Sequence, residues 1–149
     1  MKNKLFLVLI CILVFDEIHS QKIFRNDFEA AIPGLPYLLM NWEKDGFIAT
    51  WEDGLDTRSF IDSTRAVSGE NSLRITYPKD SVGPSGSGTQ VNIILPDRDE
   101  YYLSYWLRFS DNFSFQLGGK LPGLAAGDLC SGGQVCDGTN GFTARFMWR

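Results

Sequence analysis

The side chains best suited to chemistry stand near the end of the sequence, in the segments 118–124 (GGKLPGL) and 141–149 (GFTARFMWR). The first segment contains Lys120, and the second contains Thr143 and Arg145. An arginine guanidinium binds a carboxylate through two parallel hydrogen bonds. A lysine beside another cation has a lowered pKa and can act as a base. With the hydroxyl of Thr143, this set is suited to binding an acidic substrate and removing a proton from it.

The first twenty residues have the layout of a secretory signal peptide. Two lysines precede an unbroken apolar run, Leu5–Phe15, and a short polar stretch follows. A spanning helix needs roughly 20 apolar residues, about twice this run. We therefore expect cleavage after Ser20 and a secreted, extracellular protein without a membrane segment; a retained anchor is the alternative.

Removal of residues 1–20 leaves a single domain, residues 21–149, without any histidine, because the only one is His19. A catalytic Ser-His-Asp triad, a Cys-His pair and histidine-bound metals are thereby excluded. We expect no metal and no other cofactor. The net charge of -4 argues against nucleic acid as a partner. It does not exclude an anionic polysaccharide, since a basic cleft can exist on an acidic surface.

Two cysteines remain after the leader, Cys130 and Cys136. An even pair in a secreted chain predicts a disulfide. The alternative is a pair of free or metal-binding thiols, but two cysteines without histidine make a poor zinc site.

Alternating polar and apolar residues predict an all-β fold, since side chains alternate between the faces of a strand. Turn residues separate the expected strands, and only Asp27–Ala31 suggests a turn of helix. The expected strands are Phe47–Trp51, Ser72–Tyr77, Gln90–Leu95, Tyr101–Phe109 and Phe142–Trp148, and a mostly loop region spans Lys120–Asn140. Several short alternating strands indicate a β-sandwich of the jelly-roll type.

One face of such a sheet is free to form a groove. The expected groove residues are cations, an amide and an aromatic side chain on the more polar strand faces: Arg74, Asn92, Trp106, Arg108 and Arg145. This mixture suits an acidic sugar chain, and a solvated outer face is the alternative for each residue.

The two motifs, the segment 102–109 (YLSYWLRF) and the segment 130–133 (CSGG) resemble polysaccharide lyase family 14 in this order, most strongly over residues 68–149. The resemblance implies that Lys120 and Arg145 are catalytic, and that Thr143 replaces a serine. It also implies a Tyr-x-Tyr pair on the next strand, and the sequence ends at Arg149. We therefore expect residues 21–149 to be a truncated jelly roll that lacks part of the active site and has no lyase activity by itself, whereas a chain extended through the missing strands should be active.

The resemblance implies a polysaccharide lyase that cleaves alginate or glucuronan by β-elimination, and we expect a monomer. A non-catalytic carbohydrate-binding jelly roll is the alternative. A glycoside hydrolase is disfavoured because it needs two carboxylates, and the two motifs contain no Asp or Glu. Asn112, Phe113 and Ser114 form an N-glycosylation sequon in an expected surface turn; the alternative is an unused sequon.

Overall fold

The computed structural model describes residues 22–83, 85–115, 117–130 and 136–149, so the predicted signal peptide lies outside the described residues. Within them, strands far outweigh helices, which confirms the predicted all-β class. The elements are α1 (Leu39–Lys44), β1 (Ile48–Asp53), α2 (Leu55–Arg58), β2 (Ser59–Asp62), β3 (Ser72–Ile75), β4 (Gln90–Ile94), β5 (Gly119–Gly127) and β6 (Gly141–Trp148).

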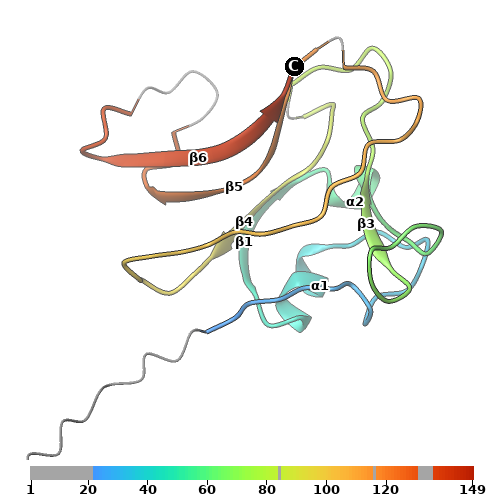
Figure 1. The fold of residues 1–149 in the computed structure, drawn as a ribbon, viewed down its shortest axis with the longest axis horizontal. Helices are drawn as coiled ribbons and strands as arrows, with labels where there is room; N and C mark the ends of the chain where they lie inside the picture. The colour runs from blue at the N-terminus through green and yellow to red at the C-terminus, as the bar shows by residue number, and fades with distance from the viewer. Residues whose placement is uncertain (1–21, 84, 116, 131–135) are drawn as a thin grey trace, which may run out of the picture.

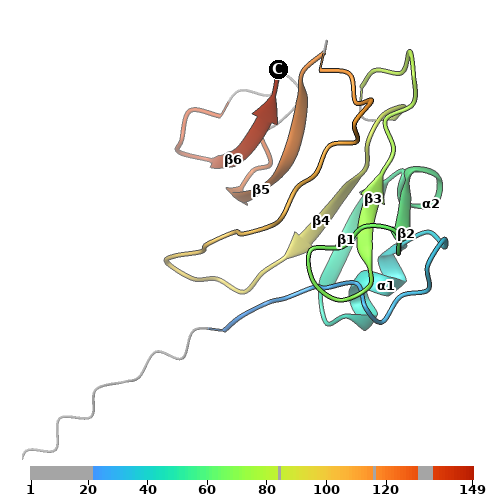
Figure 2. The same ribbon diagram turned by 45° about the vertical axis from the view of Figure 1, so that its right-hand side comes forward.

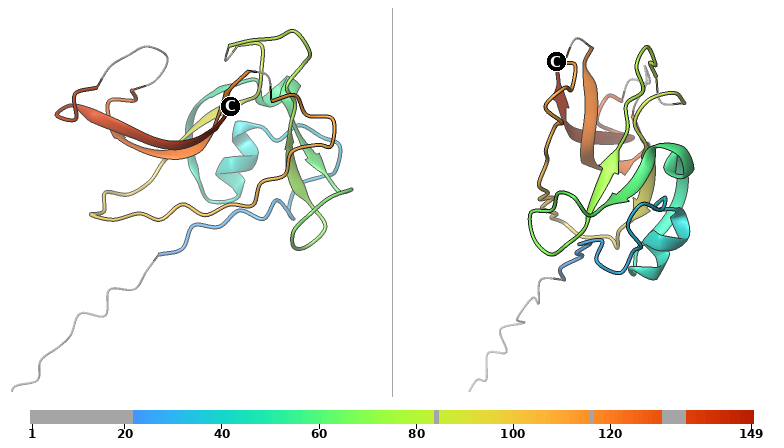
Figure 3. Two further views of the ribbon diagram at one scale, coloured as in Figure 1. Left: turned by 45° about the horizontal axis from the view of Figure 1, so that its top comes forward. Right: turned by 90° about the vertical axis from the view of Figure 1, so that its right-hand side faces the viewer.

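The described strands pair into three antiparallel two-stranded sheets, β1 with β4, β2 with β3, and β5 with β6. The β5–β6 hairpin lies at one end of the molecule, away from α1, β2 and β3 (Figure 1, Figure 2). The further views show the same separation (Figure 3). These sheets do not establish the strand order of a jelly roll, which stays a prediction.

The predicted strand Tyr101–Phe109 is wrong. The segment is extended, but it forms no strand with any described element. It runs beside the β5–β6 hairpin (Figure 2). Alternation indicates where side chains would point in a strand, whereas a strand also requires a neighbouring backbone to pair with.

The prediction of a loop from Lys120 to Asn140 is also wrong in its first part, where β5 forms. The glycines permit a close approach between strands rather than a loop. A Cβ atom on Gly123 would lie 2.4 Å from Cβ of Arg145 and 2.3 Å from the carbonyl oxygen of Ala144.

The remaining predictions concern shorter elements. Asp27–Ala31 forms no helix, only a turn. The four strands predicted at 47–51, 72–77, 90–95 and 142–148 are confirmed to within a few residues. Strand β2 and the helices α1 and α2 were not expected.

The main core lies in the N-terminal region, residues 22–75, where Tyr37, Leu55 and Ile61 are almost fully buried. Rings of Phe28 and Trp42 contact Tyr37 edge-on, with centroids 5.3 and 5.1 Å away. Such edge-to-face contacts are favourable for aromatic rings. The hydroxyl of Tyr37 donates to Asp45 and accepts a hydrogen bond from Asn26. The buried polar group is therefore satisfied.

A second aromatic cluster surrounds Trp148 at the end of β6. Tyr77, Phe109 and Phe113 place their ring centroids 5.2 to 5.6 Å from it. The Trp148 indole Nε1 donates to the carbonyl oxygen of Leu117 at 3.1 Å. These contacts attach the hairpin to Tyr77, which follows β3, and to the segment before β5.

Candidate functional site

The β5–β6 hairpin brings the three predicted catalytic residues into one small sheet. In its register, Lys120 pairs with Met147, Gly123 with Arg145, and Ala125 with Thr143. Residues directly opposite each other in an antiparallel pair point to the same side of the sheet. Arg145 and Thr143 lie two residues apart on β6 and therefore share a face.

Lys120 shares that face, as its strand neighbour shows. The ring of Trp148 covers Gly119, where a Cβ atom would lie 2.0 Å from the ring. Lys120 follows Gly119, and Arg145 precedes Trp148 by three residues, so both point to the side opposite that ring. We call the side that carries Lys120, Thr143 and Arg145 the polar face of the hairpin.

The polar face carries two positive charges that no carboxylate of the described residues neutralises. Neither β5 nor β6 contains an Asp or Glu. Lys120 is exposed and Arg145 is half-buried, and neither forms an ion pair within the part of the chain that the structure describes. Two cations on one face without a described carboxylate partner form a suitable site for an anionic ligand.

The hydroxyl of Thr143 lies on the same face. Its Oγ1 atom is buried and has no hydrogen-bond partner among the described residues. Leaving a buried polar atom unpaired costs about 1–3 kcal/mol. The described residues therefore leave the hydrogen-bonding capacity of this hydroxyl unused.

The opposite side of the hairpin is apolar and largely uncovered by described residues. Phe142 and Phe146 are 54% and 72% exposed, and only Trp148 at the end of the strand is buried. Burial alternates along β6 from Gly141 to Phe146, in line with the predicted alternation. Thr143 and Arg145 are half-buried, whereas Phe142, Ala144 and Phe146 are exposed.

The other predicted groove residues lie on different elements. Arg74 is on β3, and Asn92 is on β4 in another sheet. Trp106 and Arg108 lie on the extended 101–109 segment, where Trp106 is 82% exposed. The sheet pairing does not bring these four residues together with Arg145, and their common groove stays a prediction.

Two of these arginines also have carboxylate partners. Arg74 lies 3.8 Å from Asp62 and over the ring of Phe60, and Arg108 lies 3.5 Å from Asp111. A substrate carboxylate would have to compete with these partners. Lys120 and Arg145 face no such competition from described residues.

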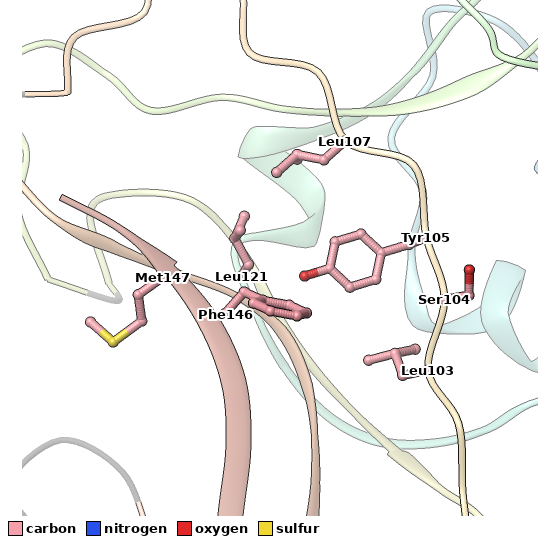
Figure 4. A pocket seen from close by; sticks show the side chains of 7 residues that line it. All are labelled: Leu103, Ser104, Tyr105, Leu107, Leu121, Phe146 and Met147. Atoms are coloured by element: carbon pink, nitrogen blue, oxygen red, sulfur yellow. The ribbon is translucent and has the colours of Figure 1, made fainter.

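A pocket of about 420 Å³ separates the 101–109 segment from the hairpin (Figure 4). Its lining is mostly apolar and consists of Leu103, Ser104, Tyr105, Leu107, Leu121, Phe146 and Met147. The Tyr105 hydroxyl donates to the carbonyl oxygen of Pro122 at 3.3 Å. Burial raises the pKa of Tyr105, so the phenol stays protonated near neutral pH.

Tyr105 and Leu121 lie in the motifs that carry the family resemblance, but neither is among the predicted site residues. Tyr105 falls on the apolar face of the predicted strand, and Leu121 falls in the predicted loop. The proximity of Tyr105 to the Lys-Leu-Pro motif is a tertiary contact over 17 residues, which local patterning does not contain.

Cys130 and Cys136 form the predicted disulfide, in the connection between β5 and β6. Asn112 is exposed in a turn where the Phe113 amide donates to the carbonyl oxygen of Ser110, a surface position as expected. No described helix is long and apolar enough to cross a membrane.

The family model described as Polysaccharide lyase 14 matches residues 65–149, and the chain belongs to this family. The matched range includes both aromatic and cationic features of the hairpin and excludes most of the N-terminal core. Neither the curated proteins nor the solved structures contain a match to this chain.

Proposed function

We propose that this protein is a secreted lyase that cleaves a uronic-acid polymer, alginate or glucuronan, by β-elimination. The observation that carries the proposal is the polar face of the hairpin, where Lys120 and Arg145 are both unpaired among described residues. Their position within the part that matches a polysaccharide lyase family adds to it.

The reaction needs a cation at the uronate carboxylate. A base removes the proton from the ring carbon next to that carboxylate, which leaves negative charge on the carboxylate oxygens. The electron pair then forms a carbon–carbon double bond as the bond to the glycosidic oxygen breaks, and that oxygen takes up a proton. Donors that are already in place stabilise the developing charge.

We assign the carboxylate to Arg145, whose guanidinium can bind both oxygens. Lys120, on the same face, is the proposed base. The unpartnered hydroxyl of Thr143 is the proposed hydrogen-bond donor to the substrate. Arg74, Asn92, Trp106 and Arg108 remain proposed contacts to the rest of the polymer.

Secretion is part of the proposal. A disulfide between Cys130 and Cys136 is typical of proteins that fold in an oxidising compartment. An extracellular location also suits a polymeric substrate, and glycosylation at the exposed Asn112 is proposed for a host that modifies sequons.

The test is an elimination assay with the purified full-length gene product. Alginate and glucuronan should give the ultraviolet absorbance of an unsaturated uronate, and neutral dextran should give none. Lys120→Ala and Arg145→Ala should each lower the rate at least about 100-fold. Lys79→Ala and Arg98→Ala, at exposed positions outside the hairpin, serve as matched controls. Near-normal rates in both hairpin variants would contradict the assigned roles.

A non-catalytic carbohydrate-binding protein is the second candidate. The observation in its favour is the exposure of Tyr102 and Trp106, at 81% and 82%, on the 101–109 segment. Exposed aromatic rings are platforms on which sugar rings stack. Retention on immobilised alginate without any rise in ultraviolet absorbance would favour this candidate over the lyase.

A further inference from the structure

Strand β5 contains an irregularity directly after Lys120. Between the pairs Lys120–Met147 and Gly123–Arg145, β5 has two residues and β6 has only Phe146. The extra residue is the defining feature of a β-bulge, which shifts the alternation of side chains by one position. The two β5 residues in the bulge are Leu121 and Pro122.

This shift decides which way Lys120 points. In a regular strand, two residues three positions apart point to opposite faces. Lys120 would then lie on the side opposite Gly123, and therefore opposite Arg145, whose Cβ lies against Gly123. With the bulge, both Lys120 and Arg145 are on the polar face. One extra residue therefore creates the juxtaposition on which the proposed chemistry depends.

The composition of the bulge is consistent with this arrangement. Proline has no backbone N–H group, so Pro122 leaves no donor unpaired where the ladder is interrupted. Its carbonyl oxygen accepts a hydrogen bond from the hydroxyl of Tyr105. In Figure 4 the Tyr105 ring extends from the 101–109 segment toward Leu121, with its oxygen directed at the hairpin.

We propose that the bulge at Leu121 and Pro122 places Lys120 beside Arg145, and that Tyr105 is the positioning residue that holds it. Tyr105 acts through the backbone of Pro122 and not on the substrate. The expected effect on rate rests on the proposed lyase function. The positioning of Lys120 by the bulge and Tyr105 does not depend on that function.

The sequence offers a closely matched control. Tyr101 lies on the same segment, and its hydroxyl also donates to a proline carbonyl oxygen, that of Pro96. Tyr101→Phe and Tyr105→Phe thus remove the same type of bond at two places. Because only Tyr105 contacts the bulge, only its variant should affect Lys120.

The kinetic experiment uses both variants of the full-length gene product. Tyr105→Phe should lower kcat roughly threefold to tenfold, the effect of one net hydrogen bond, with little change in KM. Tyr101→Phe should retain kcat. In a Lys120→Ala background, Tyr105→Phe should have no further effect. An undiminished kcat in Tyr105→Phe, or a full additional loss in the Lys120→Ala background, would overturn the positioning role.

The structural experiment does not depend on activity. Nuclear Overhauser contacts between Lys120 and its partner Met147 should be present in the wild type and in Tyr101→Phe, and should weaken in Tyr105→Phe. Unchanged contacts in Tyr105→Phe would overturn the proposal even if the enzyme is active. Weakened contacts in a protein whose Lys120→Ala variant keeps its rate would support the positioning role and contradict the proposed function.

Discussion

The N-terminal region, residues 22–75, and the β5–β6 hairpin differ in how many of their apolar side chains are buried. Among the residues that the structure describes, four of the five buried hydrophobic side chains, Tyr37, Ala49, Leu55 and Ile61, lie in the N-terminal region, and the fifth is Trp148 at the end of the hairpin. Burial of apolar surface is the dominant favourable contribution to folding. Among the described residues, stability is therefore concentrated in the N-terminal region.

The same two regions also differ in whether their cationic side chains form ion pairs with carboxylates. Arg58 lies 3.1 Å from Asp53 and Arg74 lies 3.8 Å from Asp62 in or beside the N-terminal strands. The hairpin instead keeps Lys120 and Arg145 without ion-pair partners in the described part of the chain. Unpaired charge contributes nothing to folding and is useful for binding. Most of the described buried core therefore lies in one region, and the proposed site lies in the other.

The largest expected effect on stability is in the N-terminal core. Ile61→Ala should reduce the free energy of unfolding by about 2–5 kcal/mol, because it removes packed methyl groups and leaves a cavity. Chemical denaturation followed by circular dichroism measures this change.

A much smaller effect on stability is expected for a substitution in the hairpin. Arg145→Ala should change the free energy of unfolding far less, by about 0.5 kcal/mol, because its half-buried side chain has no ion-pair partner among the described residues. A loss in Arg145→Ala as large as that in Ile61→Ala would break the division between the two regions.

An intermediate effect is expected for the disulfide. Replacing Cys130 and Cys136 together by serine should cost about 2 kcal/mol, since the bond links residues only six positions apart and restricts a short loop. The change should be confined to the hairpin. Hydrogen exchange should quicken in β5 and β6 and stay unchanged around Tyr37; uniform acceleration throughout the protein would contradict a local role.

An effect smaller than that of the disulfide is expected at two similar Asp-x-Thr turns, one in each region. Thr64 donates from its amide and hydroxyl to Asp62 at 2.8 and 2.6 Å, and Thr139 does the same to Asp137 at the same distances. The hydroxyl bond and then the amide bond lower the pKa of each carboxyl below its usual value. Asp62 also lies at the end of β2 beside Arg74.

Thr64→Ala should reduce stability at neutral pH by about 0.5–1.5 kcal/mol. The folded-state pKa of Asp62 is depressed, so the stabilisation is present above the unfolded-state pKa and is lost as pH falls through the folded-state value. The difference between Thr64→Ala and the wild type should therefore vanish in strong acid. Thr139→Ala should have a smaller effect, and equal effects would argue against a difference between the two regions.

The sequence predicted those strands in which alternation coincides with an available partner, such as Ser72–Tyr77 and Phe142–Trp148. It did not predict the state of Tyr101–Phe109, because pairing depends on which backbone lies alongside. The short helices α1 and α2 have six and four residues, too few for a helical stripe to be recognised.

The candidate site was predictable in its residues but not in its geometry. Lys120, Thr143 and Arg145 stand out through their motifs. Their shared face follows from the strand register and from the bulge after Lys120. The glycines and the proline of that segment predict a loop, so the sequence alone does not indicate strand β5. A bulge is defined by counting residues against a partner strand, and one strand alone does not supply that count.

The most direct test of the site is a titration of the isotope-labelled protein with uronate oligosaccharides, followed by nuclear magnetic resonance. The amide signals of Lys120, Thr143 and Arg145 should shift with the uronate. A neutral oligosaccharide should leave them unchanged, and Arg145→Ala should abolish the shifts. Shifts confined to residues 22–75, or binding that survives Arg145→Ala unchanged, would contradict the claim that the polar face of the hairpin binds the uronate.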